Sequence, residues 1–127
     1  MNFHDTLISH LEMELITNQA NLVEMKMPVS DKTKQPMGFL HGGATVALAE
    51  TAASIGGLAN IDPTNQLVFG IEINANHIKS KRDGWIMARA TPKHIGSKTM
   101  VWQIDVVDEA EQLISTARCT LGIVDKQ

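Results

Sequence analysis

Hydrophobic positions follow two different periods along the chain. Over residues 44–58 the apolar and small residues, many of them alanine, do not alternate with polar ones, which predicts a buried helix. Most of the remaining chain alternates with the period of a β-strand, between clusters of turn-forming residues. We expect a short amphipathic helix at residues 3–11 and strands at residues 12–18, 21–29, 67–78, 85–91, 97–107 and 112–124.

This order of elements predicts the fold class. One long buried helix with a run of strands after it is typical of an α+β domain in which an antiparallel sheet wraps around the helix. A chain of 127 residues is long enough for one core, so we expect residues 1–127 to form a single domain. The alternation places each of two sets of side chains on one face of its strand: Phe69, Ile71, Ile73 and Ala75, and Met100, Trp102, Ile104 and Val106.

Composition narrows the classes of function. The core must be aliphatic and rich in methionine, because 43% of the residues are hydrophobic and only 4% are aromatic. A net charge of −3 argues against a nucleic-acid partner, since binding to phosphates needs a basic surface. No segment has the length of a membrane span or the pattern of a signal peptide, so we expect a cytoplasmic protein with no membrane partner. The single cysteine, Cys119, excludes an intrachain disulfide and is expected to be a small core residue.

One carboxylate stands in an unusual place. Glu50 lies within the predicted helix, where its neighbours three and four residues away are small or apolar, and the helix has almost no polar face to which it could belong. A buried carboxylate loses hydration and becomes a more reactive base or nucleophile when something holds it in place. Ser54, one turn later, can donate the hydrogen bond that orients it. The alternative is a surface glutamate beside a packed stripe.

The turn before this helix offers a complementary group. Gly42 and Gly43 let a ligand approach the first backbone N–H groups of the helix, which have no partner within it and lie at the positive end of its dipole. Such donors stabilise a carbonyl oxygen that becomes negative during acyl transfer. The alternative is a glycine-rich helix entry that serves packing alone.

The spacing of His41 and Glu50 indicates a second chain. They are nine residues apart, which at about 100° per residue leaves roughly half a turn of net rotation. They would therefore point to opposite sides of the helix. If both serve one reaction, the simplest geometry is a two-fold dimer in which one chain supplies the turn and the other the carboxylate.

Three motifs in order resemble a known family. They are Lys-Gln-Pro-Met-Gly-Phe-Leu-His-Gly-Gly-Ala at 34–44 with Leu-Ala-Glu at 48–50, Gly-Ile-Glu-Ile-Asn-Ala-Asn-His at 70–77, and His-Ile-Gly-Ser-Lys at 94–98 with Val-Trp-Gln at 101–103. Over residues 25–124 the chain resembles the hotdog-fold acyl-CoA thioesterases of the phenylacetate-degradation type. Within that family it most resembles bacterial 1,4-dihydroxy-2-naphthoyl-CoA hydrolases of menaquinone synthesis and the related enterobactin proofreading thioesterases. The resemblance implies the hotdog fold, with the sheet wrapped around one long central helix, and homodimers commonly paired into homotetramers.

The resemblance also implies catalytic roles. Glu50 matches the catalytic carboxylate of the family, and the Gly42 N–H matches the donor that polarises the thioester from the opposite subunit. His41 would contact the thioester, Gln35 would sit against the reacting carbonyl or water, and Ser54 would orient Glu50 or line the acyl pocket. Apart from the CoA that belongs to the substrate, no cofactor is implied. Three histidines and Glu50 raise the question of zinc, but no pair has ligand spacing on one element, so we expect no metal.

Two further sets of residues follow from the resemblance. The acyl pocket would be lined by Thr51, Ser54, Ile55 and Val68. His77 would lie near the acyl ring or the CoA arm, and the CoA nucleotide would be contacted by Ser80, Arg82, Gly96, Ser97 and Lys98. Many relatives carry Arg after the glycine, where this chain has Ser97-Lys98.

The expected reaction is hydrolysis of an acyl-CoA thioester, with an aromatic acyl group such as dihydroxynaphthoyl as the first choice and medium-chain or other aryl groups as alternatives. Two other functions stay open at this point. One is a hotdog dehydratase or hydratase, which releases no thiol. The other is an acyl-CoA-binding protein without catalysis.

Overall fold

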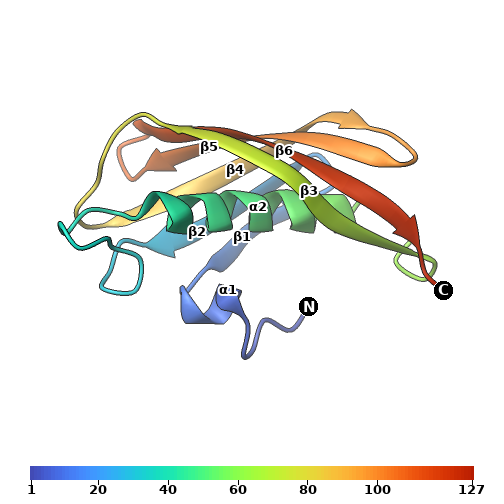
Figure 1. Cartoon of the computed structure of the whole chain (residues 1–127), viewed down its shortest axis with the longest axis horizontal. Coiled ribbons are helices and arrows are strands. Elements are labelled where there is room, and N and C mark those ends of the chain that lie inside the picture. The colour runs from blue at the N-terminus through green and yellow to red at the C-terminus, as the bar shows by residue number, and fades with distance from the viewer.

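A six-stranded antiparallel sheet curves around one long helix in the computed structural model, which describes residues 1–127 (Figure 1). The helix is α2 (Gly42–Leu58), and a single turn, α1 (Leu7–His10), precedes the sheet. Along the sheet the order is β1-β2-β4-β5-β6-β3. The strands are β1 (Glu14–Gln19), β2 (Leu22–Pro28), β3 (Gln66–His77), β4 (Trp85–Ile95), β5 (Thr99–Asp108) and β6 (Leu113–Asp125). This is the α+β architecture that the sequence predicts.

The core lies between α2 and the concave face of the sheet. Small residues on the helix let the sheet come close: a Cβ added to Gly56 would lie 2.5 Å from the ring of Trp102, which is fully buried. Methionines fill much of the remaining space, as the composition indicates. The inward-facing side chains of the four central strands include Val23, Met25, Met27, Ile86, Ala88, Ala90, Met100, Trp102, Ile104, Val106, Cys119 and Leu121.

Most element boundaries differ from the prediction by one or two residues, and three differences stand out. Helix α2 begins at Gly42, two residues early, because the side chain of His41 caps it. Strand β4 continues to Ile95 although Pro92 cannot donate a ladder hydrogen bond, because a bulge between Pro92 and His94 shifts the register there. The predicted helix at residues 3–11 is confined to the four residues of α1.

Strand β3 also differs from the prediction in which way its side chains face. A register shift against β6 between Gly70 and Glu72 interrupts the alternation. Ile73 and Ala75 pack against the core, but Phe69 and Ile71 are 56% and 63% exposed. The prediction of one continuous face is therefore wrong for Phe69 and Ile71, because one extra residue turns the preceding side chains to the other side.

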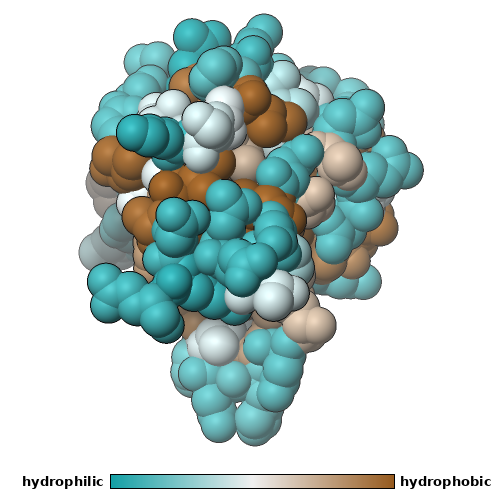
Figure 2. Space-filling view, turned by 90° about the vertical axis from the view of Figure 1, so that its right-hand side faces the viewer, coloured by the Kyte–Doolittle hydropathy of each residue, from teal (hydrophilic) through white to brown (hydrophobic).

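Strand β3 is an edge of the sheet, and no strand of this chain pairs with its outer side. It is twelve residues long, and Leu67, Phe69 and Ile71 are all exposed along it. Hydrophobic surface also shows between polar side chains at the end of the molecule that carries the C-terminus (Figure 2). A long apolar edge of this kind is a template for pairing with another strand.

Neither helix has the length and apolarity needed to cross a bilayer.

Candidate active site

The start of α2 presents an unpaired backbone donor. His41 is the N-cap, and its Nδ1 accepts a hydrogen bond of 2.8 Å from the Gly43 N–H. Within the chain the Gly42 N–H makes no hydrogen bond. It therefore remains available to a ligand at the positive end of the helix dipole.

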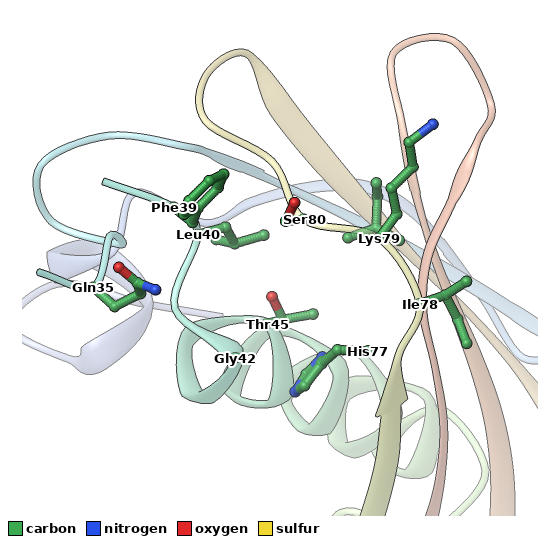
Figure 3. Close-up of a pocket in the computed structure, with 10 residues that line it drawn as sticks. Gln35, Phe39, Leu40, Gly42, Thr45, His77, Ile78, Lys79 and Ser80 are labelled. Carbon is green, nitrogen blue, oxygen red and sulfur yellow. The ribbon is translucent and has the colours of Figure 1, made fainter. Parts of the chain in front are cut away.

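His77, at the end of β3, lies directly against this turn (Figure 3). A Cβ added to Gly42 would lie 2.6 Å from its Nε2, so any larger residue at position 42 would have to push the ring aside. On the other side of the ring, Nδ1 is 3.1 Å from the hydroxyl of Ser115, which is buried and donates its proton to the Asn76 carbonyl. Because a hydroxyl has one proton, Nδ1 donates to Ser115 and Nε2 faces Gly42 as an acceptor.

Gly42 and His77 line the first of two cavities that concern the predicted site. It has a volume of about 300 Å³ (Figure 3). Gln35 contributes to it from the preceding loop, where its side-chain oxygen accepts the Met37 N–H. The guanidinium of Arg82 stacks 4.1 Å above the ring of Phe39 beside it. The cavity is lined by Gln35, Phe39, Leu40, Gly42, Thr45, His77, Ile78, Lys79, Ser80 and Ile114.

Glu50 lies on the third turn of α2 and is half-buried. Its carboxylate occupies the space beside Gly70 of β3, at the bulge: a Cβ there would lie 3.2 Å from the Glu50 Cδ and closer still to Oε2. No side chain or backbone N–H of the chain donates a hydrogen bond to this carboxylate. In particular, the hydrogen bond predicted from Ser54 does not form. The acid is thus positioned by packing and keeps all its acceptor capacity for a ligand.

Glu50 lines the second cavity, of about 440 Å³, together with the predicted pocket residues Thr51, Ser54 and Ile55. Val68, which was also predicted to line it, lies elsewhere: it packs beside Gly57, where an added Cβ would be 3.1 Å from its Cγ2. The opposite wall comes from the N-terminal segment, which the sequence does not associate with the site. The cavity is lined by Met1, Phe3, Leu7, Ile8, Ala47, Glu50, Thr51, Ser54, Ile55 and Leu58.

Within one chain Gly42 and Glu50 do not reach the same atom. They line different cavities, and their separation of eight residues corresponds to about 12 Å along the helix axis. This separation agrees with the opposed directions that the sequence predicts for His41 and Glu50. A carbonyl held at both groups needs the turn of one chain and the carboxylate of another.

The predicted CoA contacts likewise fall into two groups. His77 and Ser80 line the first cavity, with Arg82 next to it. Gly96, Ser97 and Lys98 form the turn between β4 and β5, where the Lys98 carbonyl accepts the Ile123 N–H. Ile123 pairs with Val68, near the start of β3, and His77 lies nine residues further on, about 30 Å along the strand. One chain therefore does not bring the two groups together.

Ionisable groups elsewhere are engaged in structural pairs. Arg89 bridges Glu24 and Glu111. Hydrogen bonds from Thr17 and Arg89 lower the pKa of the Glu24 carboxyl, and that from Arg89 lowers the pKa of Glu111. Desolvation, with smaller contributions from Glu50 and Glu72, raises the pKa of the Cys119 thiol to about 12, so this buried residue is not a nucleophile at neutral pH. No three His, Cys, Asp or Glu side chains cluster where they could hold a metal ion.

Sequence reasoning missed two residues of this arrangement. Gly70 was part of a quoted motif, and a glycine inside a strand pattern is a signal of a bulge or of a close approach. Nothing in the sequence marks Ser115 as the partner of His77, because their proximity depends on the pairing of β3 with β6.

Comparison with known proteins places the chain among thioesterases. The sequence profile of the thioesterase superfamily matches residues 37–115. The chain is 49% identical to ComA2 of Bacillus subtilis, over 99% of this chain and 100% of ComA2. It is 44% identical to the 1,4-dihydroxy-2-naphthoyl-CoA hydrolase of Listeria monocytogenes, over 91% of this chain and 93% of that protein.

A solved structure extends the likeness to three dimensions. It is a variant of SAV0944 from Staphylococcus aureus, with a TM-score of 0.92 and 45% identity over 94% of this chain and 99% of that one. In this variant a glutamate is replaced by alanine. A second solved structure of the same protein, described there as a thioesterase, has a glutamine replaced by alanine. The two replaced positions are 15 residues apart, the same separation as between Gln35 and Glu50.

Proposed function

The chain belongs to the thioesterase superfamily, and we propose that it hydrolyses acyl-CoA thioesters to a carboxylic acid and free CoA. One observation carries the proposal. The Glu50 carboxylate is packed against Gly70 at the wall of a largely apolar cavity, without a hydrogen-bond partner from its own chain. A carboxylate in such a place is set up to act on a ligand.

In the proposed reaction the Gly42 N–H of the partner subunit binds the thioester carbonyl oxygen and stabilises the negative charge that develops on it. A donor of this kind contributes about 3 to 4 kcal/mol in other enzymes. Glu50 either takes a proton from the attacking water or attacks the carbon itself, giving a mixed anhydride that water then hydrolyses. By either route the C–S bond breaks, its electron pair leaves with sulfur, and the thiolate takes up a proton.

The exposed edge of β3 supports a homodimer as the smallest active unit. Two copies of β3 can pair antiparallel about a two-fold axis and cover Leu67, Phe69 and Ile71. The same pairing offers each Glu50 a turn from the other chain. It would also allow the 96–98 turn of the partner subunit to join Ser80 and Arg82 around one CoA nucleotide. Pairing of dimers into tetramers is the further expectation from the family.

An aromatic acyl group, with 1,4-dihydroxy-2-naphthoyl-CoA as the first candidate, is the substrate that we propose. The 44% identity to a hydrolase of that name and the largely apolar lining of the Glu50 cavity support it. The test is release of free thiol from a panel of aromatic and aliphatic CoA esters. A dehydratase or a binding protein would release none, so the absence of thiol with every ester would refute the proposal.

Replacing the acid tests its role. We expect Glu50→Gln to abolish thiol release without a change in melting temperature, because the carboxylate makes no hydrogen bond that holds the fold together. Glu14→Gln, at an exposed position in β1, is the matched control and should keep full activity. A folded Glu50→Gln protein with near wild-type turnover would refute the assignment.

A further inference from the structure

The cavity beside Glu50 has two walls of different character. One is the face of α2 that carries Glu50, Thr51 and Ser54, and the other is formed by the side chains of Met1, Phe3, Leu7 and Ile8. We propose that the N-terminal segment, residues 1–11, is the part of the chain that selects the acyl group of the substrate. This inference rests on the proposed function, since it takes the ligand at Glu50 to be an acyl thioester.

The distribution of polar groups indicates the class of acyl group. The four N-terminal side chains are all apolar, so the part of the ligand that meets them must be hydrocarbon. On the α2 wall, the Thr51 hydroxyl already donates to the Ala47 carbonyl, at 2.7 Å. The Ser54 hydroxyl makes no hydrogen bond in the chain and remains free. The cavity therefore suits an aryl or alkyl acyl group whose polar substituents lie on the Ser54 side only.

The size of the cavity excludes a short acyl group as the best fit. From Ala47 to Leu58 the α2 wall extends over twelve residues, about 16 Å along the helix axis. An acetyl group at the carboxylate would fill little of the 440 Å³. A longer or aromatic group would reach the N-terminal wall and bury apolar surface against it.

The N-terminal segment is held against the domain by residues other than Leu7. Phe3, Ile8 and Leu11 pack against the core, and the Met13 N–H donates to the Ile8 carbonyl at 2.9 Å. Leu7, on the same turn, is 56% exposed and contributes nothing to the core. A change at Leu7 should therefore alter the cavity and leave the fold intact.

Two opposite substitutions at Leu7 test the inference with acetyl-, hexanoyl-, benzoyl- and naphthoyl-CoA. Leu7→Trp narrows the cavity and should lower kcat/KM for naphthoyl-CoA by about tenfold or more relative to acetyl-CoA, in the range that small changes in a hydrophobic pocket produce. Leu7→Ala removes apolar contact and should lower kcat/KM for hexanoyl-CoA by up to about tenfold, with acetyl-CoA changed less than about twofold. Ile16→Ala, at an exposed apolar position of β1 outside the cavity, is the matched control.

The outcomes separate this inference from the proposed function. If the wild-type protein releases no thiol from any ester, the proposed function fails. If it does, but both Leu7 variants change all four esters equally or change none, the N-terminal wall does not select the acyl group. Size-exclusion chromatography completes the test: a Leu7→Trp variant that loses its dimer and all its activities together would show that a second chain covers this cavity, which also overturns the inference.

Discussion

Gly70→Ala is the substitution that we expect to lower activity most while changing the stability of the fold least. The added Cβ would lie 3.2 Å from the Glu50 Cδ and less than 3.0 Å from Oε2, closer than real Cβ atoms approach another heavy atom. Comfortable contacts are about 3.5 to 4.0 Å, so the carboxylate must move by about 1 Å. The atoms that must move are the end of a flexible side chain, and the fold should adapt at little cost.

A displacement of this size matters for catalysis. Moving a reacting group by about 1 Å can cost about 100-fold in rate, so we expect kcat for thiol release to fall by that factor while the melting temperature changes by only a few degrees. The matched control is Gly122→Ala in β6, where the new Cβ would crowd the Ile71 side chain at 2.8 Å and touch no part of Glu50. Because Ile71 lies on the edge of β3 proposed to pair in the dimer, size-exclusion chromatography must first show that this variant is still a dimer, and it should then retain most of the activity.

A double-mutant cycle makes the reasoning specific to the carboxylate. Glu50→Asp shortens the side chain and withdraws it from position 70, so adding Gly70→Ala to that variant should cost far less than it costs the wild type. A Gly70→Ala protein with kcat within about threefold of wild type would refute the geometric argument. Fully additive losses would show that the new methyl group acts through something other than Glu50.

Three further predictions concern groups around the site and the stability of the sheet. Ser115→Ala removes the hydroxyl that holds the His77 ring against Gly42 and should lower kcat/KM about five- to tenfold, the value of one hydrogen bond; unchanged kinetics would show that this hydrogen bond does not position the ring for the substrate. Cys119, with its pKa raised to about 12, should react slowly with a chromogenic thiol reagent at pH 8 in the native protein and rapidly in denaturant; rapid labelling of the native protein would show that the thiol is accessible. Because hydrogen bonds from Thr17 and from Arg89 lower the pKa of Glu24, the stability that these contacts contribute is present above the ordinary pKa near 4.5 and is lost as pH falls through the lower folded value. Arg89→Ala should therefore begin to unfold at a higher pH in an acid titration followed by circular dichroism, and an unshifted titration would contradict this.

The helix and the central strands could be predicted because their determinants are local. The apolar run of α2 holds over its whole length and the alternation in β5 holds from Thr99 to Val106, and the four residues predicted to share one face of β5 are all fully buried. Strand β3 could not be predicted in the same way. Its alternation changes phase at the bulge beside Gly70, which is fixed by pairing with β6 and by the space that Glu50 requires.

For the candidate site, the sequence singles out individual groups but does not indicate which of them share a cavity. Glu50 stands out because a charge interrupts an apolar helix, and Gly42 because it precedes that helix. No sequence pattern indicates that the N-terminal segment forms a wall of the Glu50 cavity, since Leu7 and Ile8 have the spacing of an ordinary amphipathic turn. Which residues share a cavity depends on how the segment before β1 lies against α2, and no local pattern encodes that.

The extra residue in β3 has a consequence for newly made protein. The same bulge turns Phe69 and Ile71 outward, where a second copy would cover them, and provides the space beside Gly70 that the acid fills. On the proposed arrangement, dimer formation and the position of the catalytic carboxylate therefore depend on the same point of the backbone. A newly synthesised monomer would not hydrolyse thioesters until it forms a dimer. Deleting the extra residue, so that β3 became a regular strand, would remove both properties together.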